Sequence, residues 1–88
     1  MSKISFSNRA WGEYCYWQNQ DKKTIKRINI LLKDIIWNGY SGMGKPEPLS
    51  ENLTGFWSRR IDDANRLVYR ITKDGVEVVQ CKGHYSNK

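Results

Sequence analysis

The sequence contains few of the residues that bind metals or form disulfides. One histidine and two cysteines, Cys15 and Cys81, occur in 88 residues, and no Cys-x-x-Cys spacing is present. The usual spacing of metal ligands is therefore missing, and we expect neither a metal nor another cofactor. Because Cys15 falls in a helical pattern and Cys81 in a strand pattern, we expect two reduced thiols rather than a disulfide.

Long apolar runs are also absent, so we expect no membrane-spanning helix and no membrane partner. The first five residues lack the apolar stretch of a secretion signal, and we therefore expect a cytoplasmic protein. A chain this short makes one domain, residues 1–88, and its hydrophobic fraction of 39% excludes a wholly disordered chain.

Acidic residues are the minority among the charged ones. Nine aspartates and glutamates stand against 15 lysines and arginines, which leaves a formal net charge of +6. Such an excess on a small domain favours a polyanionic partner, because counterions released from a phosphate backbone contribute much of the affinity. An acidic partner protein would fit the same charge.

The first half of the chain predicts a short strand and two amphipathic helices. Residues 4–6 read as the strand, Ser7 and Asn8 can cap a helix to about residue 19, and Asp21 can cap a second helix that ends at Gly39. The expected apolar stripes are Trp11, Tyr14 and Cys15 on the first helix, and Ile25, Ile28, Leu32, Ile35 and Ile36 on the second. We expect these side chains to form core rather than to stack on bases.

Residues 39–49 form a segment rich in glycine and proline. Three glycines and two prolines in eleven residues exclude a helix or a strand here. Pro46 and Pro48 flank Glu47 and restrict the backbone around it, which would suit a catalytic carboxylate.

The last third predicts three strands, at residues 55–61, 67–72 and 76–83. A three-residue turn at 73–75 would pair Thr72 with Val76, and hence Arg66 with Lys82, and a similar connection would pair Arg60 with Val68. The expected fold class is α+β, in which a first strand and two helices precede a three-stranded antiparallel meander and the helices pack on one sheet face.

Strand alternation divides the side chains of this sheet into an apolar face and a charged face. The apolar set is Trp57, Ile61, Leu67, Tyr69, Ile71, Val79 and Cys81, and the charged set is Ser58, Arg60, Arg66, Arg70, Gln80, Lys82 and His84. The division is imperfect, because Arg59 falls with the apolar set and Val68, Val76 and Val78 fall with the charged set. Part of the charged face should therefore be covered.

The charged face and the proline-flanked Glu47 together contain the groups that cleave RNA without a metal. That reaction needs a base for the 2′-hydroxyl, cations for the phosphorane and an acid for the 5′-oxygen, and Glu47, the arginines and His84 supply them. Structural alternatives remain for each group. Asp62, Asp63 or Glu77 could neutralise the arginines, Glu47 could be a solvated loop carboxylate, and His84 a near-terminal imidazole.

Several segments carry a specific family pattern. They are residues 44–49 (GKPEPL), 52–61 (NLTGFWSRRI), 65–69 (NRLVY) and 84–85 (HY), with Trp11 and residues 14–18 (YCYWQ) and 21–23 (DKK) upstream. Together they resemble the Txe/YoeB family of bacterial toxins, within the RelE-like superfamily, over nearly the whole chain. The resemblance implies a microbial-ribonuclease-like fold and ribosome-dependent cleavage of mRNA in the A site, with contacts to 16S rRNA. It also implies a tight complex with a cognate antitoxin protein and, often, a homodimer.

The resemblance further implies individual catalytic roles. Glu47 resembles the general base of the family, His84 its general acid, and Arg66 the cation that stabilises the transition state.

Four further residues are expected to support RNA binding. Arg60 would help to hold the phosphate, Lys45 matches a basic loop residue, and Tyr85 matches the aromatic residue next to the acid. Lys82 joins this group from the charged face of the sheet.

The chain departs from the family pattern at two places. Ser50 and Glu51 stand where some relatives carry a basic residue, which should weaken RNA contacts there, and residues 86–88 extend past the usual His-Tyr end. We expect that extension to be harmless if it points away from the cleft.

Two other functions fit the same residues. A non-catalytic module could block translation by occupying the A site, and a pure interaction protein could use the cationic face to bind an acidic antitoxin. Neither requires Glu47 or His84.

Overall fold

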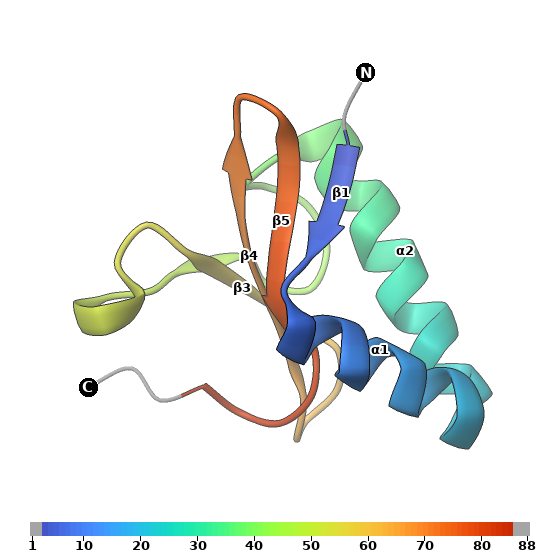
Figure 1. Ribbon diagram of the computed structural model, residues 1–88. Coiled ribbons are helices and arrows are strands. Elements are labelled where there is room, and N and C mark those ends of the chain that lie inside the picture. Colours follow the sequence, from blue (N-terminus) through green and yellow to red (C-terminus); the bar gives the residue numbers. More distant parts are fainter. Residues whose placement is uncertain (1–2, 86–88) are drawn as a thin grey trace.

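The computed structural model describes residues 3–85, and the extension at 86–88 lies outside these residues. The elements follow the order β1 (Lys3–Phe6), α1 (Asn8–Gln20), α2 (Lys22–Asn38), β2 (Glu47–Pro48), a 3-10 turn η1 (Glu51–Leu53), β3 (Trp57–Arg60), β4 (Arg66–Thr72) and β5 (Gly75–Gln80). Both helices lie on one side of the sheet (Figure 1), which confirms the expected α+β class.

The helix boundaries follow from the predicted caps. The Ser7 hydroxyl accepts a hydrogen bond from the Ala10 amide, and the Asp21 carboxylate accepts from the amides of Lys23 and Thr24. Gly39 ends α2 with a φ of 65°, a conformation that glycine adopts without strain. Two capping side chains therefore set where the helices begin, and the backbone freedom of one glycine sets where α2 ends.

The sheet has five strands in the order β1-β5-β4-β3-β2, with β1 parallel to β5 and the other neighbours antiparallel. The prediction that residues 39–49 contain no strand was wrong, because Glu47 and Pro48 pair with Ser58 and Trp57 of β3. Proline has no amide hydrogen, but it is tolerated at a sheet edge, where one side of the strand has no partner.

The predicted hairpin registers were also wrong. Arg60 pairs with Arg66 instead of Val68, a shift of two residues that leaves both side chains on the predicted face. Thr72 pairs with Gly75 instead of Val76, because the turn between β4 and β5 contains only Lys73 and Asp74.

The shorter turn changes which valines reach the core. Val76 and Val78 are buried there, although they were predicted on the charged face, and Val79 is only half-buried. A bulge at Val68 and Tyr69 then shifts the register by one residue, so that Val68 pairs with Gln80 and Cys81 returns to the core as predicted.

The core lies between the helices and the sheet. It consists of Ala10, Ile28, Leu31, Leu32, Ile35, Ile61, Leu67, Tyr69, Val76, Val78 and Cys81. Leu31, which was not predicted, is fully buried, while the predicted Ile36 and Trp11 are 39% and 52% exposed. The buried faces are therefore centred on Ala10 and on Ile28 to Ile35, slightly rotated from the predicted stripes. No helix within residues 3–85 is long and apolar enough to cross a membrane.

Candidate active site

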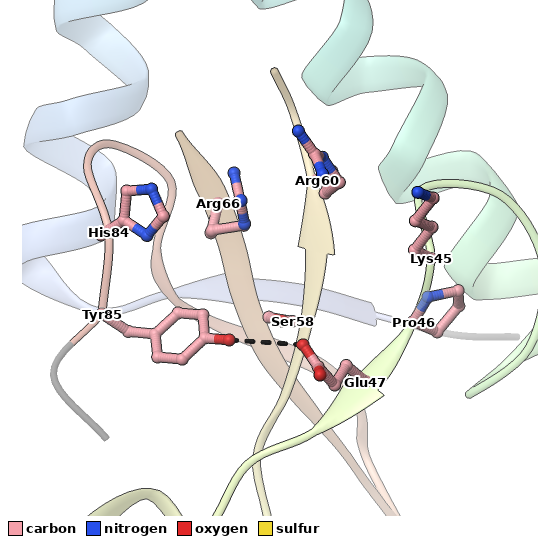
Figure 2. A pocket seen from close by; sticks show the side chains of 8 residues that line it. All are labelled: Lys45, Pro46, Glu47, Ser58, Arg60, Arg66, His84 and Tyr85. Carbon is pink, nitrogen blue, oxygen red and sulfur yellow. Dashed lines mark hydrogen bonds between the residues drawn. The ribbon is translucent and has the colours of Figure 1, made fainter. Parts of the chain in front are cut away.

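A cavity of about 290 Å³ opens at the edge of the sheet where β2, β3 and β4 meet the C-terminal segment. Its lining consists of Lys45, Pro46, Glu47, Ser58, Arg60, Arg66, His84 and Tyr85 (Figure 2). Six of the seven site residues expected from the sequence thus line one cavity, and Pro46 and Ser58 complete it. Ser58 belonged to the predicted charged face, so alternation along β3 was the signal that could have identified it.

The loop that leads to Glu47 is held by a buried arginine. Arg59 has no exposed surface, and its guanidinium pairs with Asp34 and donates to the carbonyl oxygens of Gly39 (2.8 Å), Ser41 (2.8 Å) and Met43 (3.0 Å). Arg59 therefore lies on the buried face of the sheet, as strand alternation predicted, and these hydrogen bonds compensate for the burial of its charge. The Arg59 side chain thus binds carbonyl groups of a loop that lies outside helices and strands, and it holds the loop in place.

Backbone contacts then carry the chain from this loop to Glu47. The amide of Arg60 donates to the Gly44 carbonyl at 2.7 Å, and Glu47 pairs with Ser58 across β2 and β3. Gly44 has a φ of +82°, and a Cβ at this position would lie 3.3 Å from the Arg60 carbonyl oxygen. A side chain would thus be unfavourable here, and Glu47 projects from a short edge strand.

Two arginines face each other across neighbouring strands in the cavity. Arg60 on β3 pairs with Arg66 on β4, an arrangement of like charges that is unfavourable without an anion. Arg60 Nη2 meets the carboxylate of Asp63 at 2.5 Å, so the structural alternative predicted for these arginines is realised here. However, the Asp63 side chain is fully exposed, and an ion pair of this kind contributes little and can be displaced by a phosphate.

Arg66 is held by the turn between β3 and β4. Its Nη1 donates to the carbonyl oxygens of Asp62 (2.7 Å), Asp63 (3.3 Å) and Asn65 (3.1 Å). Anchoring through one nitrogen orients the planar guanidinium without neutralising its charge. Arg66 is therefore a positioned cation at the wall of the cavity.

The C-terminal segment brings His84 and Tyr85 to the same cavity. The Tyr85 hydroxyl donates to Glu47 Oε1 at 3.4 Å (Figure 2), so the C-terminal segment is in direct contact with β2. His84 is exposed and lies on the same side as Tyr85 in this view. The structure thus brings together a carboxylate, two guanidinium groups and an imidazole, the arrangement that general acid–base cleavage of a phosphodiester requires.

Two of the predicted cations lie elsewhere. Lys82 Nζ is 4.9 Å from the centre of the Tyr16 ring, and Arg70 pairs with Glu77 at 2.5 Å. Neither side chain lines the cavity. Lys82 follows the end of β5 and the bulge, so simple alternation does not extend to it.

Neither cysteine lines the cavity. Both cysteines are free, and burial raises the pKa of the Cys81 thiol to about 12, which makes it a poor nucleophile. Among residues 3–85, no three histidine, cysteine or acidic side chains are grouped so that they could hold a metal ion.

The chain is similar over nearly its whole length to known bacterial toxins. A family model described as YoeB-like toxin of bacterial type II toxin-antitoxin system matches residues 6–85. Toxin YoeB of Escherichia coli (strain K12) is 48% identical over 83 residues, which cover 94% of this chain and 99% of that protein.

Two solved structures from Staphylococcus aureus are similar throughout. The YoeB chain of a heterotetrameric YoeB-YefM toxin-antitoxin complex has a TM-score of 0.89 and 48% identity, with 97% of this chain and 99% of that chain covered. A YoeB dimer has a TM-score of 0.90 and 48% identity, with 96% and 98% covered.

Proposed function

Because the chain belongs to the YoeB family of toxins from bacterial type II toxin–antitoxin systems, we propose that it inhibits translation as a ribosome-dependent mRNA endoribonuclease. The observation that carries this proposal is the convergence of Glu47, Arg60, Arg66 and His84 on one cavity. A translation blocker that only occupies the A site would need a cationic surface, but not a carboxylate and an imidazole facing the same space.

The proposed reaction needs no metal. Glu47 takes the proton from the 2′-hydroxyl of a nucleotide bound in the cavity, and the 2′-oxygen attacks the adjacent phosphorus. The charge that develops on the phosphate oxygens is stabilised by Arg66 and Arg60. His84 donates a proton to the 5′-oxygen as the P–O bond breaks, so the products are a 2′,3′-cyclic phosphate, which can open to a 3′-phosphate, and a 5′-hydroxyl.

The remaining cavity residues support this chemistry. Tyr85 donates to Glu47 Oε1 and thereby orients the carboxylate, while Lys45 adds a positive charge to the lining of the cavity. The target in this proposal is mRNA in the decoding site of the ribosome, with contacts to 16S rRNA, which implies a cytoplasmic location.

Replacement of the proposed base and acid tests the function. We expect Glu47→Gln and His84→Gln each to lower the cleavage rate on mRNA-programmed ribosomes by about 100-fold or more, because each removes one proton transfer. Asp74→Asn is the control for the loss of a carboxylate, since Asp74 is exposed and does not line the cavity. Mapping of mRNA 5′ ends after expression in a bacterium supplies the second measurement.

The outcomes separate the proposals. Full cleavage by either variant would remove the role assigned to that residue. Growth arrest by the unmodified protein without new mRNA ends would show a non-catalytic blocker instead.

We also propose that the chain binds a cognate antitoxin and forms a homodimer when the antitoxin is absent. The support is the similarity to the Staphylococcus aureus YoeB-YefM complex and YoeB dimer, of which 98% or more of each chain is covered. Light scattering on the purified chain, alone and with the product of an adjacent open reading frame, measures both assemblies.

A further inference from the structure

We propose that Gln80 is a positioning residue that holds the C-terminal segment and so presents His84 and Tyr85 to the cavity. Gln80 is the last residue of β5 and is only 5% exposed. Its Nε2 donates to three successive carbonyl oxygens, those of Lys82 (3.2 Å), Gly83 (3.0 Å) and His84 (3.0 Å). The inference rests on the proposed function, because it explains how His84, the proposed general acid, is held at the cavity.

The segment after β5 needs such a donor. Residues 81–85 belong to no helix or strand, so their carbonyl groups lack the regular ladder of a sheet, and the Gly83 carbonyl accepts a single backbone hydrogen bond, from Arg66. Gly83 turns the chain with a φ of +80°, and the three carbonyls converge on the amide of Gln80. Two hydrogens on one nitrogen serve three acceptors, which an apolar or an anionic side chain cannot do.

Two further contacts fix the residue before His84. The Gly83 amide donates to Asn65 Oδ1 at 2.7 Å, and the Gly83 carbonyl accepts from the Arg66 amide at 3.0 Å. The His84 carbonyl, in contrast, is held by Gln80. Gln80 therefore restrains the backbone of His84. Asn65 connects the same segment to the turn between β3 and β4, whose carbonyl groups bind Arg66.

The other catalytic candidates are positioned differently. Glu47, Arg60 and Arg66 project from paired strands, whereas His84 is exposed and follows a turn. Gln80 does not line the cavity, so it acts through the backbone of residues 82–84 and not on the substrate. Its loss should therefore impair proton transfer to the leaving group more than binding of RNA.

Two isosteric replacements test this role. Gln80→Met keeps length and burial without a donor, and Gln80→Glu places a carboxylate against three carbonyl oxygens. We expect kcat on programmed ribosomes to fall by about 10- to 100-fold with KM nearly unchanged, since a small misplacement of a catalytic group has effects of this size. Gln18→Met, an exposed glutamine on α1, is the matched control, and Gln80→Lys, which retains donors, should recover part of kcat.

A second measurement does not depend on activity. His84 is the only histidine in the chain, so its imidazole gives a single set of ring proton signals in an NMR spectrum. We expect Gln80→Met and Gln80→Glu to move these signals toward those of a free histidine and to speed hydrogen exchange of the Gly83 amide. Gln18→Met should change neither.

These measurements overturn the inference if the Gln80 variants keep kcat within about twofold, raise KM alone, or leave the His84 signals in place. If a variant unfolds, Gln80→Lys and the NMR spectrum of the folded fraction decide the matter. If the unmodified protein cleaves no RNA, the proposed function fails, and the His84 signals still show whether Gln80 positions the imidazole.

Discussion

The two arginines of the cavity are restrained in different ways. Arg60 contacts an exposed carboxylate, Asp63, whereas Arg66 uses one nitrogen to bind three backbone carbonyls of the preceding turn. A phosphate would compete with the Asp63 carboxylate for Arg60, whereas it would not need to displace the uncharged carbonyl groups that bind Arg66. Arg66 is for this reason the better candidate for the group that stabilises the transition state, with Arg60 as a phosphate contact.

This difference predicts that a lysine at position 66, which keeps the positive charge, does not restore the function of the Arg66 guanidinium. We expect Arg66→Lys to lower kcat by about 100-fold, because an ammonium group cannot hold the turn carbonyls and face the phosphate at the same time. Single-turnover cleavage on programmed ribosomes measures the effect. Arg70→Lys on the same strand is the control, since Arg70 lies outside the cavity. Cleavage by Arg66→Lys at the rate of the control would exclude a specific role for the guanidinium.

At the scale of secondary-structure elements, the loop between α2 and β2 depends on one ion pair, whose arginine is buried and whose carboxylate is partly exposed. Arg59 joins Asp34 of α2 to three loop carbonyls, and it also contacts the Tyr69 hydroxyl at 3.1 Å. The hydrogen bond from Arg59 holds the pKa of Asp34 below its ordinary value of 3.8, assisted by the Met43 amide and opposed by desolvation.

The sign of this shift sets how stability depends on pH. A carboxylate with a lowered pKa in the folded state contributes stability that is complete above its unfolded pKa and is lost as the pH falls through the folded pKa. We therefore expect the urea midpoint, followed by tryptophan fluorescence, to decrease as the pH falls below 3.8, the ordinary pKa of the aspartate carboxyl. Asp34→Asn should lower the urea midpoint at neutral pH and make its decrease at low pH, the acid limb of the curve, less steep.

Some acid sensitivity should remain in Asp34→Asn. The pKa of Asp21 is also lowered, mainly by the hydrogen bond from the Thr24 amide at the start of α2. Asp74→Asn, in the exposed turn between β4 and β5, is the control for the removal of a negative charge. An acid limb in Asp34→Asn as steep as in the unmodified protein would contradict the role of the pair with Arg59.

On the scale of the whole molecule, two separate groups of lysines and arginines are candidates for binding RNA. The cavity contains Lys45, Arg60 and Arg66 at one sheet edge, while α2 carries Lys22, Lys23, Lys26 and Lys33 on its exposed surface. The net charge of +6 alone does not show which region binds RNA. The dependence of binding on salt distinguishes them, because each neutralised phosphate releases counterions.

We expect Glu47→Gln protein to bind a short single-stranded RNA with a log–log salt slope of about −2, since each of three cavity cations contributes about −0.7. Arg60→Ala should reduce the steepness by about 0.7, and Lys33→Ala on α2 should leave it unchanged. Fluorescence anisotropy of a labelled RNA at several salt concentrations measures the slopes. An effect of Lys33→Ala equal to that of Arg60→Ala would place the RNA on α2.

Much of the architecture was predictable because it depends on short-range chemistry. Caps at Ser7, Asp21 and Gly39 and the apolar periodicity between them specify both helices, and these signals act within a few residues. Alternation along β3 and β4 likewise placed Ser58, Arg60 and Arg66 on one face. Glu47 and His84 were predicted from chemistry and from the family motif, although nothing in their spacing shows that they meet.

The remaining features were decided by contacts between distant segments. The parallel pairing of β1 with β5, the edge strand at Glu47, the bulge near Val68 and the position of Lys82 depend on which backbone groups find partners in three dimensions. The same holds for Arg59 and Gln80, whose donors bind carbonyl groups of segments that lie outside helices and strands. Sequence by itself determined the helices and the faces of β3 and β4, because local periodicity and caps need no distant partner. Tertiary structure alone decided the registers and the meeting of base and acid, because buried polar groups must find partners wherever the fold places them.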